Sequence, residues 1–333
     1  MATMKQVAER AGVSISTVSH VINNTRVVSD DVRQRVLGVI AEMRYIPSAV
    51  ARSLKNDKTN MIGVLVPDSS NPYFAELIRW LEDAAFEAGY NIILCNAQGG
   101  AAKQAAYLRL LMEKRIDGLV LVVSSADRER ELLTRAETVP IIQIERALPG
   151  LEADAILAGE PGGAAQAAHH LLELGHRDIA CVAGPASLPR TRERLGGFLR
   201  AMEEAGRPVP RERIVHEAFT SAGGYAAFNR LLTSDRPPSA IFATSDLMAF
   251  GGLWAAREIG VRVPEQLSVI GFDDLDGVGY TSPPLTTVAP PKRDMARLAL
   301  AWLVERIRGG QAAQRRTALE SRLVLRATCA PPR

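Results

Sequence analysis

The first sixty residues carry apolar positions three and four apart, the spacing of helices that pack on one side. The pattern predicts three short helices. A capping box of Thr3 and Gln6 opens the first, Gly12 ends it, and Ser14 caps the second. A turn of about three residues between two short helices is helix-turn-helix geometry. The buried faces are expected to be Met4, Val7, Ala8 and Ala11, then Val18, Val21 and Ile22, then Val32, Val36, Val39, Ile40 and Met43.

From Met61 the pattern changes to short apolar runs that alternate with helical segments. Continuous apolar runs are typical of parallel strands buried on both faces. Two series of such units predict two doubly wound parallel-sheet subdomains in an α/β body. The expected strands are 61–66, 91–95, 116–123 and 140–144, then 179–184, 240–244 and 267–272, with a short strand at 286–288.

These patterns divide the chain into an all-α headpiece and a body. We expect the headpiece at 1–58, with the helix-turn-helix at about 4–23, and the body at 59–333. Within the body, one subdomain is expected at about 61–159 plus 289–320, and the other at about 160–288.

Composition narrows the class of protein. The chain has 333 residues, 47% of them hydrophobic, and no apolar run approaches the roughly 18 residues that a membrane span needs. The first residues lack the apolar core of a secretory signal, so we expect a cytoplasmic protein without a membrane partner. Three widely spaced cysteines, Cys95, Cys181 and Cys329, favour neither a disulfide framework nor a zinc site, and no metal is expected.

Charge is distributed unevenly along the chain. Residues 1–60 hold nine Lys or Arg and five Asp or Glu, whereas the remaining chain is close to neutral. A small basic module on a neutral body fits phosphate binding, although a solvated basic helix would look similar.

The second predicted helix leaves one face outside the core of the headpiece. That face holds Ile15, Ser16, Ser19 and His20, short or hydrogen-bonding side chains near the helix start. Such side chains suit base edges in the major groove. The alternative is a three-helix module with an ordinary polar surface.

The whole segment from Val7 to Asn23 resembles the headpiece of the lactose-repressor family and is closest to its purine- and ribose-repressor branch. The resemblance continues from Tyr45 to Leu54 and covers essentially the whole chain, weakening after about residue 310. It implies operator DNA as a partner and a body like that of the periplasmic sugar-binding proteins. The DNA-binding residues that we expect in the headpiece are Ile15, Ser16, Thr17, Ser19, His20, Asn23 and Arg26, with Lys5 and Arg33 adding phosphate affinity.

A hinge helix is expected at about 48–56, too short to be stable alone in water. In the family this helix enters the minor groove, where its leucine wedges into a base step. The resemblance gives that role to Leu54, with Lys55 beside it. Leu54 could instead be an ordinary helix residue, but Arg52, Lys55 and Lys58 leave it little core to join.

Polar and aromatic residues follow the predicted strands of the body. Because ligands gather beyond the carboxyl ends of such strands, we expect an effector cleft there. Carboxylates and a guanidinium beside aromatic rings suit a hydroxyl-rich ligand with one apolar face. Asp246 alone could equally be a helix cap. The expected effector-binding residues are Asn71, Tyr73, Phe74, Arg146, Arg194, Phe219, Asp246 and Asp273, of which the resemblance itself assigns Arg194, Asp246, Asp273 and the aromatic wall of Tyr73 and Phe74.

Two departures from the family pattern bear on ligand identity. Ala158-Gly159 stands where many relatives have an Asp-Asn pair. Glu145-Arg146 stands where sugar-responsive members often have Asp-Arg, and the tryptophan of the purine branch is missing.

Together these patterns predict a repressor that binds a palindromic operator as a homodimer and is released by a small sugar-like inducer such as ribose. The alternative is a purine-type repressor that needs a corepressor. A solute-binding protein without regulation would leave the headpiece unexplained. An enzyme is not expected, because neither phosphate-loop motif nor a catalytic triad spacing is present, and no cofactor is expected.

Overall fold

The computed structural model describes residues 2–45, 58–97, 100–122 and 139–332. The chain forms two compact units, Met1–Asn60 and Met61–Arg333, here called the headpiece and the body. The headpiece is all-α and the body is an α/β fold of two six-stranded sheets, so the predicted fold class is confirmed. The predicted hinge helix at 48–56 lies outside the described residues.

Three helices make the headpiece: α1 (Met4–Ala11), α2 (Ile15–Asn23) and α3 (Asp30–Glu42). The capping box forms as expected, since the Thr3 hydroxyl accepts the Gln6 N–H and Gln6 Oε1 accepts the Thr3 N–H at 2.8 Å. Gly12 ends α1 in the left-handed conformation, with φ of 64°, which glycine adopts without strain. Val7, Val18 and Val36 are fully buried and close the core between the helices.

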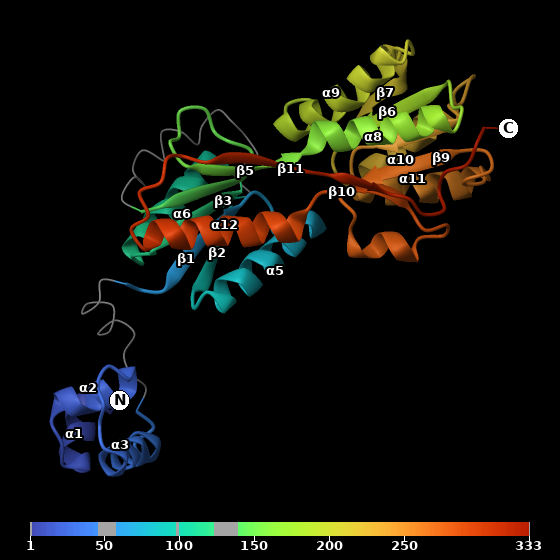
Figure 1. Cartoon of the computed structure of the whole chain (residues 1–333). Helices are drawn as coiled ribbons and strands as arrows, with labels where there is room; N and C mark the ends of the chain where they lie inside the picture. Colours follow the sequence, from blue (N-terminus) through green and yellow to red (C-terminus); the bar gives the residue numbers. More distant parts are fainter. Residues whose placement is uncertain (1, 46–57, 98–99, 123–138, 333) are drawn as a thin grey trace. The chain divides into compact units, whose positions relative to one another are not determined.

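The first subdomain of the body is built on a parallel sheet in the order β11-β5-β4-β3-β1-β2 (Figure 1). Helices α5 (Pro72–Glu87) and α12 (Lys292–Ile307) join one hydrophobic cluster with this sheet, and α6 (Ala101–Glu113) joins another. The strands are β1 (Met61–Val66), β2 (Asn91–Asn96), β3 (Gly118–Val122), β4 (Ile141–Glu145), β5 (Asp154–Gly159) and β11 (Arg316–Glu320).

The second subdomain has the sheet order β12-β10-β9-β8-β6-β7, parallel except for β12, which runs antiparallel to β10. Helices α8 (Glu160–Glu173) and α9 (Pro189–Glu204) pack in one cluster with this sheet, and α10 (Ser221–Leu232) and α11 (Asp246–Ile259) in the other. Its strands are β6 (Ile179–Ala183), β7 (Ile214–His216), β8 (Ala240–Ala243), β9 (Ser268–Phe272), β10 (Thr286–Ala289) and β12 (Arg322–Val324), with short 3-10 helices η1 (Arg211–Arg213) and η2 (Asp276–Tyr280).

The chain passes between the two sheets three times. The first passage joins β5 to α8, the second joins β10 to α12, and the third joins β11 to β12 through Ser321. The division expected from the sequence ended at residue 320, so it did not include the third passage. The segment after β12 is part of the second subdomain, because the Thr328 hydroxyl donates to the Val269 carbonyl at 2.6 Å and the Ala330 carbonyl lies 3.0 Å from His176 Nε2.

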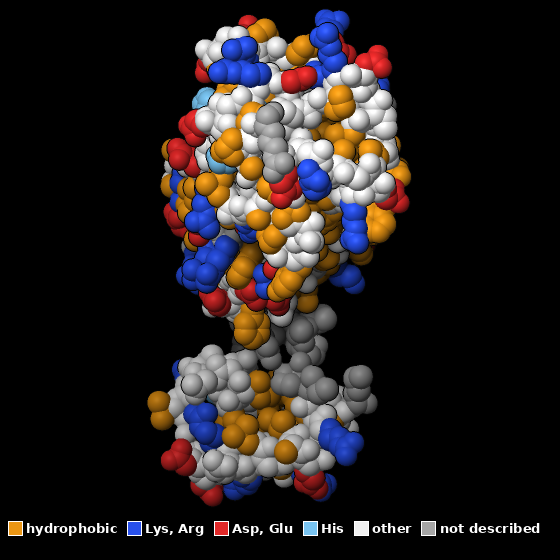
Figure 2. Space-filling view, turned by 90° about the vertical axis from the view of Figure 1, so that its right-hand side faces the viewer, with side chains coloured by type: hydrophobic (Ala, Val, Ile, Leu, Met, Phe, Trp, Pro, Cys, Tyr) orange, Lys and Arg blue, Asp and Glu red, His pale blue; other side chains and the backbone are white. Residues whose placement is uncertain are grey.

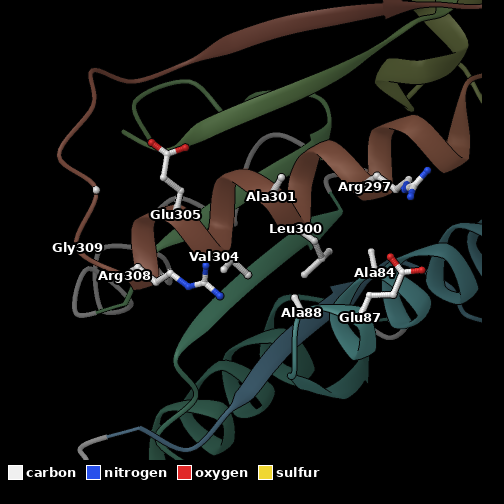
Figure 3. A pocket seen from close by; sticks show the side chains of 11 residues that line it. Ala84, Glu87, Ala88, Arg297, Leu300, Ala301, Val304, Glu305, Arg308 and Gly309 are labelled. Carbon is white, nitrogen blue, oxygen red and sulfur yellow. The ribbon is translucent and has the colours of Figure 1, made fainter.

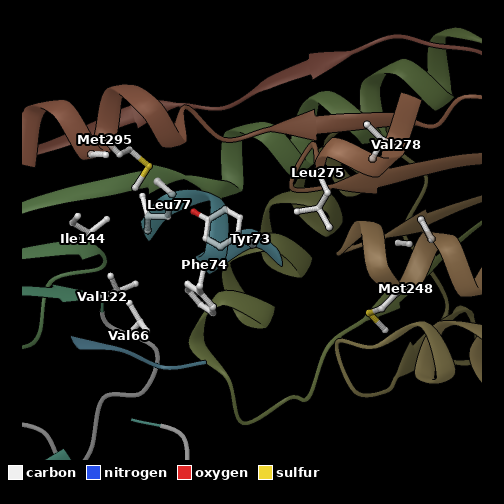
Figure 4. Packing of buried hydrophobic residues seen from close by; sticks show 14 of the residues in the cluster. Val66, Tyr73, Phe74, Leu77, Val122, Ile144, Met248, Leu275, Val278 and Met295 are labelled. Atoms are coloured by element: carbon white, nitrogen blue, oxygen red, sulfur yellow. The ribbon is translucent and has the colours of Figure 1, made fainter. Parts of the chain in front are cut away.

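One hydrophobic cluster extends through both subdomains. Tyr73, Phe74 and Leu77 at the start of α5 belong to the same cluster as Met248 and Leu275 from the second subdomain (Figure 4). The two sheets therefore share a packed seam, and the polar residues at their strand ends lie beside it.

Candidate functional site

Helix α2 presents the polar face that the sequence predicted for DNA recognition. Val18 and Val21 point into the headpiece core, which leaves Ile15 48% exposed and Ser16 exposed at the start of the helix. Ser14 caps this end, since its hydroxyl accepts the Thr17 N–H at 3.1 Å. The first turn is thus fixed by the cap while its outer side chains remain accessible.

Other predicted DNA-binding residues are partly engaged within the headpiece. His20 Nδ1 lies 2.8 Å from the Thr25 hydroxyl, and Asn23 donates to the Ser19 carbonyl at 2.9 Å. These contacts orient side chains of α2 and of the turn that follows it. Thr17 is half-buried and its hydroxyl lies 2.9 Å from that of Ser14, whereas Arg26 is exposed. Leu54 and Lys55 lie outside the described residues.

Arg194 lies at the centre of a buried charge cluster in the body. Its side chain, 1% exposed, donates from Nη2 to Glu160 Oε1 at 2.7 Å and from Nη1 to the Thr244 carbonyl at 2.7 Å. The same Nη2 lies 2.9 Å from Asp273 Oδ1. The guanidinium also lies 3.8 Å from the Phe272 ring centroid. Helix α9 and the ends of β8 and β9 therefore converge on one point, as expected for a ligand site in an open α/β sheet.

Glu145 links this cluster to the first subdomain. Glu145 is the last residue of β4 and has a φ of 79°. Its carboxylate accepts hydrogen bonds from the Tyr73 hydroxyl and from Arg190 Nη2, the latter at 2.7 Å. Arg190 also lies 3.6 Å from Glu160, and its guanidinium is 4.8 Å from the Tyr73 ring and 5.1 Å from the Phe74 ring. Two guanidinium groups and three carboxylates thus alternate across the seam between the subdomains.

Burial and neighbouring charges shift the pKa values in this cluster. Burial raises the pKa of Tyr73, and the Glu145 carboxylate raises it further, so its hydroxyl remains a donor. Burial also raises the pKa of the Glu145 carboxyl, against the opposing effect of the Arg190 charge. The carboxylates raise the pKa of Arg190 and Arg194 despite their burial, so both guanidinium groups stay charged.

Several buried polar atoms beside the cluster have no hydrogen-bond partner in the described part of the chain. They include Asp273 Oδ1, which forms only the ion pair with Arg194, the Thr191 hydroxyl on α9, and Arg146 Nη1. Buried polar groups are nearly always hydrogen-bonded, so unsatisfied ones on neighbouring strand and helix ends indicate a place for a polar ligand.

The structure places six of the eight predicted effector residues in two groups. Tyr73, Phe74, Arg194 and Asp273 meet at the cluster. Asn71 instead caps α5, accepting the Tyr73 N–H at 3.0 Å. Asp246 is fully buried and accepts hydrogen bonds from Thr287 and Leu275. Both therefore serve the scaffold in this structure.

The remaining two predicted residues are Arg146 and Phe219. Arg146 pairs with Glu193 at 3.1 Å and leaves Nη1 unsatisfied. The half-buried Phe219 ring covers Gly184, where a Cβ would lie 2.2 Å from it, so only glycine fits beneath the ring.

Three members of the cluster were absent from the predicted set, namely Glu145, Glu160 and Arg190. Glu160 follows directly after Ala158-Gly159, the positions where relatives have a polar pair. Its carboxylate pairs with Arg194, so this chain supplies a buried acid close to where the family pattern is missing. The position of Glu160 directly after Ala158-Gly159 was the feature of the sequence that could have identified it as a site residue.

A surface groove of about 770 Å³ lies elsewhere, between α5 and α12 (Figure 3). Ala84, Ala88, Leu300 and Val304 line it, and none of the predicted effector residues does. Within the described ranges, no group of three or more His, Cys, Asp or Glu is placed to hold a metal ion. None of the helices described is both long and apolar enough to cross a membrane.

Sequence families match both units of the chain. Residues 3–48 match the bacterial regulatory proteins of the lacI family, and residues 168–329 match the periplasmic binding protein-like domain. Among curated proteins, the HTH-type transcriptional repressor PurR of Photobacterium profundum is 41% identical over 327 residues, covering 98% of both chains. PurR of Proteus mirabilis is 42% identical, covering 92% of this chain and 91% of the relative.

Two similar solved structures are also transcriptional regulators of this family. The lac repressor dimer bound to operator and an anti-inducer aligns with a TM-score of 0.91 at 26% identity, covering 99% of both chains. A LacI family transcriptional regulator from Enterococcus faecium with bound ribose aligns with a TM-score of 0.73 at 32% identity, covering 82% of this chain and all of that one.

Proposed function

Because the chain belongs to the lacI family of bacterial regulatory proteins and is a ligand-responsive DNA-binding repressor, we propose that a purine base bound at the Arg194 cluster controls its operator binding. The observation that carries this proposal is the alternation of buried guanidinium and carboxylate groups beside Tyr73 and Phe74. A purine base has a flat apolar face and an edge with both donors and acceptors. The aromatic rings suit that face, and the charged groups suit that edge.

The PurR repressors that share 41–42% identity with this chain support the purine class over the sugar inducer favoured by the sequence. The ribose-bound regulator at 32% identity is the observation that keeps ribose as a second candidate. Carboxylates facing a guanidinium also suit sugar hydroxyls. Because the chemistry of the cluster fits both a purine and a sugar, an experiment has to distinguish these two effector classes.

The proposed regulation is a population shift. The cluster joins residues of both subdomains, so an effector bound there contacts both and favours one arrangement of them. A purine corepressor would favour the arrangement of a dimer that binds the operator, and affinity for DNA and for effector would rise together. In keeping with this role, we place the protein in the cytoplasm with a small-molecule effector rather than a cofactor.

On the DNA side, we assign major-groove contacts to the outer face of α2, chiefly Ile15, Ser16 and His20. Arg26 would add phosphate affinity that falls with salt. The minor-groove roles of Leu54 and Lys55 rest on the sequence alone.

Fluorescence anisotropy on a palindromic duplex selected by the protein from random DNA tests the effector class. We expect hypoxanthine or guanine to tighten binding and ribose to leave it unchanged. Asp273→Asn should bind the free duplex as the wild type does but lose the response, because one partner of Arg194 is neutralised.

Release of the duplex by ribose would instead establish the sugar inducer. No response to either compound would rule out effector control by these two classes.

A further inference from the structure

Lys292 is a buried lysine whose ammonium group has three oxygen acceptors. Its Nζ donates to the Asp273 carbonyl at 2.8 Å, to the Asp274 carbonyl at 3.0 Å, and to a carboxylate oxygen of Glu76. Lys292 is only 8% exposed. A buried ammonium is costly unless it is paired, and here each of its three N–H groups has a partner.

These contacts join the two subdomains. Glu76 lies on α5 and Lys292 is the first residue of α12, and both helices belong to the first subdomain. Asp273 and Asp274 follow β9 of the second subdomain. Glu76 also accepts the Asp276 N–H at 3.1 Å, so both of its oxygens are used. The pair therefore holds the segment from Asp273 to Asp276 against the first subdomain.

The held segment has a strained backbone. Asp273 has a φ of 119° and Asp274 a φ of 47°, a region that residues with a side chain rarely adopt. Such conformations persist only where the surroundings fix them. Lys292 binds both carbonyls, and Arg326 binds the Asp274 carboxylate at 2.7 Å.

The backbone and the side chain of Asp273 have different partners. Its carbonyl accepts a hydrogen bond from Lys292, and its carboxylate pairs with Arg194 in the effector cluster. Lys292 also lies 5.7 Å from the Tyr73 ring. It is thus adjacent to the effector cluster on two sides, while its ion pair is with Glu76.

We propose that Glu76 and Lys292 form a latch between the subdomains that positions Asp273 for effector binding. The assignment of Asp273 to an effector rests on the proposed function. Lys292 is a positioning residue, which acts through the backbone of Asp273 and couples that residue to the first subdomain. Neither member of the latch needs to touch the effector.

A double-mutant cycle on the full chain tests this role. Lys292→Met keeps the length of the side chain and removes the ammonium, and we expect effector affinity, measured by calorimetry with hypoxanthine and with ribose, to fall roughly 10- to 100-fold. If Lys292 acts through Asp273, combining Lys292→Met with Asp273→Asn should weaken binding little more than Asp273→Asn alone. Lys292→Arg should restore part of the affinity.

The matched control is Lys114→Met, the same change at an exposed lysine of the first subdomain. It should leave effector affinity unchanged. A purely structural role for Lys292 would give fold-changes that multiply with those of Asp273→Asn, and that result would overturn the latch, as would wild-type affinity in Lys292→Met.

Hydrogen exchange tests the latch without any effector. The Asp276 amide, which donates to Glu76, should exchange at least about tenfold faster in Lys292→Met than in the wild type, because Glu76 loses its fixed orientation. Unchanged exchange would refute the latch. Faster exchange in a protein that binds neither hypoxanthine nor ribose would keep the latch and refute the effector assignment.

Discussion

At the scale of single residues, Asp246 is a buried carboxyl group held by hydrogen bonds. Thr287 donates to one of its oxygens at 2.5 Å and the Leu275 N–H to the other at 2.9 Å. Burial raises its pKa to about 7, and the nearby Asp273 charge adds to the shift against these hydrogen bonds. Asp246 thus ties β10 to the segment that carries Asp273.

The raised pKa predicts a pH dependence of stability. The folded chain keeps a proton on Asp246 that the unfolded chain releases, so raising the pH from about 4 to about 7 lowers the free energy of unfolding. In Asp246→Asn this contribution should be absent, and the unfolding temperature should fall less steeply over the same range. Asp235→Asn, at an exposed position, is the control. Equal slopes for Asp246→Asn and the wild type would contradict the prediction.

The resemblance to the family was sufficient to predict part of the site. It assigned Arg194 and Asp273 to the effector, and these two residues do meet. Glu145 and Arg190 belong to different subdomains, so only the packing of one sheet beside the other could show that they pair. Asp246 lies at the predicted end of a strand, but its carboxyl points to Thr287 and not toward Arg194.

At the scale of elements, the caps of the headpiece helices differ in strength. Ser14 caps α2 through its hydroxyl, whereas Ser29 precedes α3 without a side-chain cap bond. Helix α2 is short, so its first turn depends strongly on this one contact.

We therefore predict that Ser14→Ala destabilises α2 by about 1 kcal/mol, which makes its amides exchange roughly fivefold faster and weakens operator binding by a similar factor. Ser29→Ala is the matched control and should change both quantities less. Hydrogen exchange followed residue by residue in the full chain measures the effect. A larger effect from Ser29→Ala than from Ser14→Ala would show that the Ser14 cap is not what stabilises the headpiece.

The headpiece helices and the central strands were predictable because their apolar patterns are regular or continuous. The sequence missed β5, β7, β11 and β12, which lie next to or at the sheet edges. In β11 the exposed and half-buried residues alternate, and β12 has only three residues, so neither contains an apolar run. Their strand conformation comes from pairing with a neighbour, which no local pattern predicts.

At the scale of the whole molecule, the surface of the second subdomain exposes aromatic side chains. Tyr280 on η2 is 92% exposed and Trp254 on α11 is 55% exposed. Phe250, one turn before Trp254, packs close to Gly277 of η2, so these two elements are neighbours. Figure 2 shows hydrophobic side chains at the surface among charged ones on one face of the body. Repressors of this family bind operator DNA as dimers, and the exposed aromatic side chains of α11 and η2 suit a second copy of the chain.

Tyr280→Asp should therefore weaken dimerisation by roughly thirtyfold, the loss expected for a central aromatic residue of an interface. Sedimentation velocity over a dilution series measures it. Leu325→Asp, at a residue 60% exposed after β12, is the control and should leave the dimer intact. A wild-type dimer in Tyr280→Asp would place the interface elsewhere.

The third passage between the sheets also affects how the protein is made. The first sheet lacks β11 until residues 316–320 are synthesised, and the second lacks β12 and its contacts with Thr328 and Ala330 until the chain has grown further. When residues 61–288 have emerged from the ribosome, neither subdomain thus has all of its strands. Folding of the body must finish after nearly all of it has been translated, although the headpiece helices have already emerged. A nascent repressor can form its DNA-reading helices well before it can respond to an effector, so regulated repression begins with the completed chain.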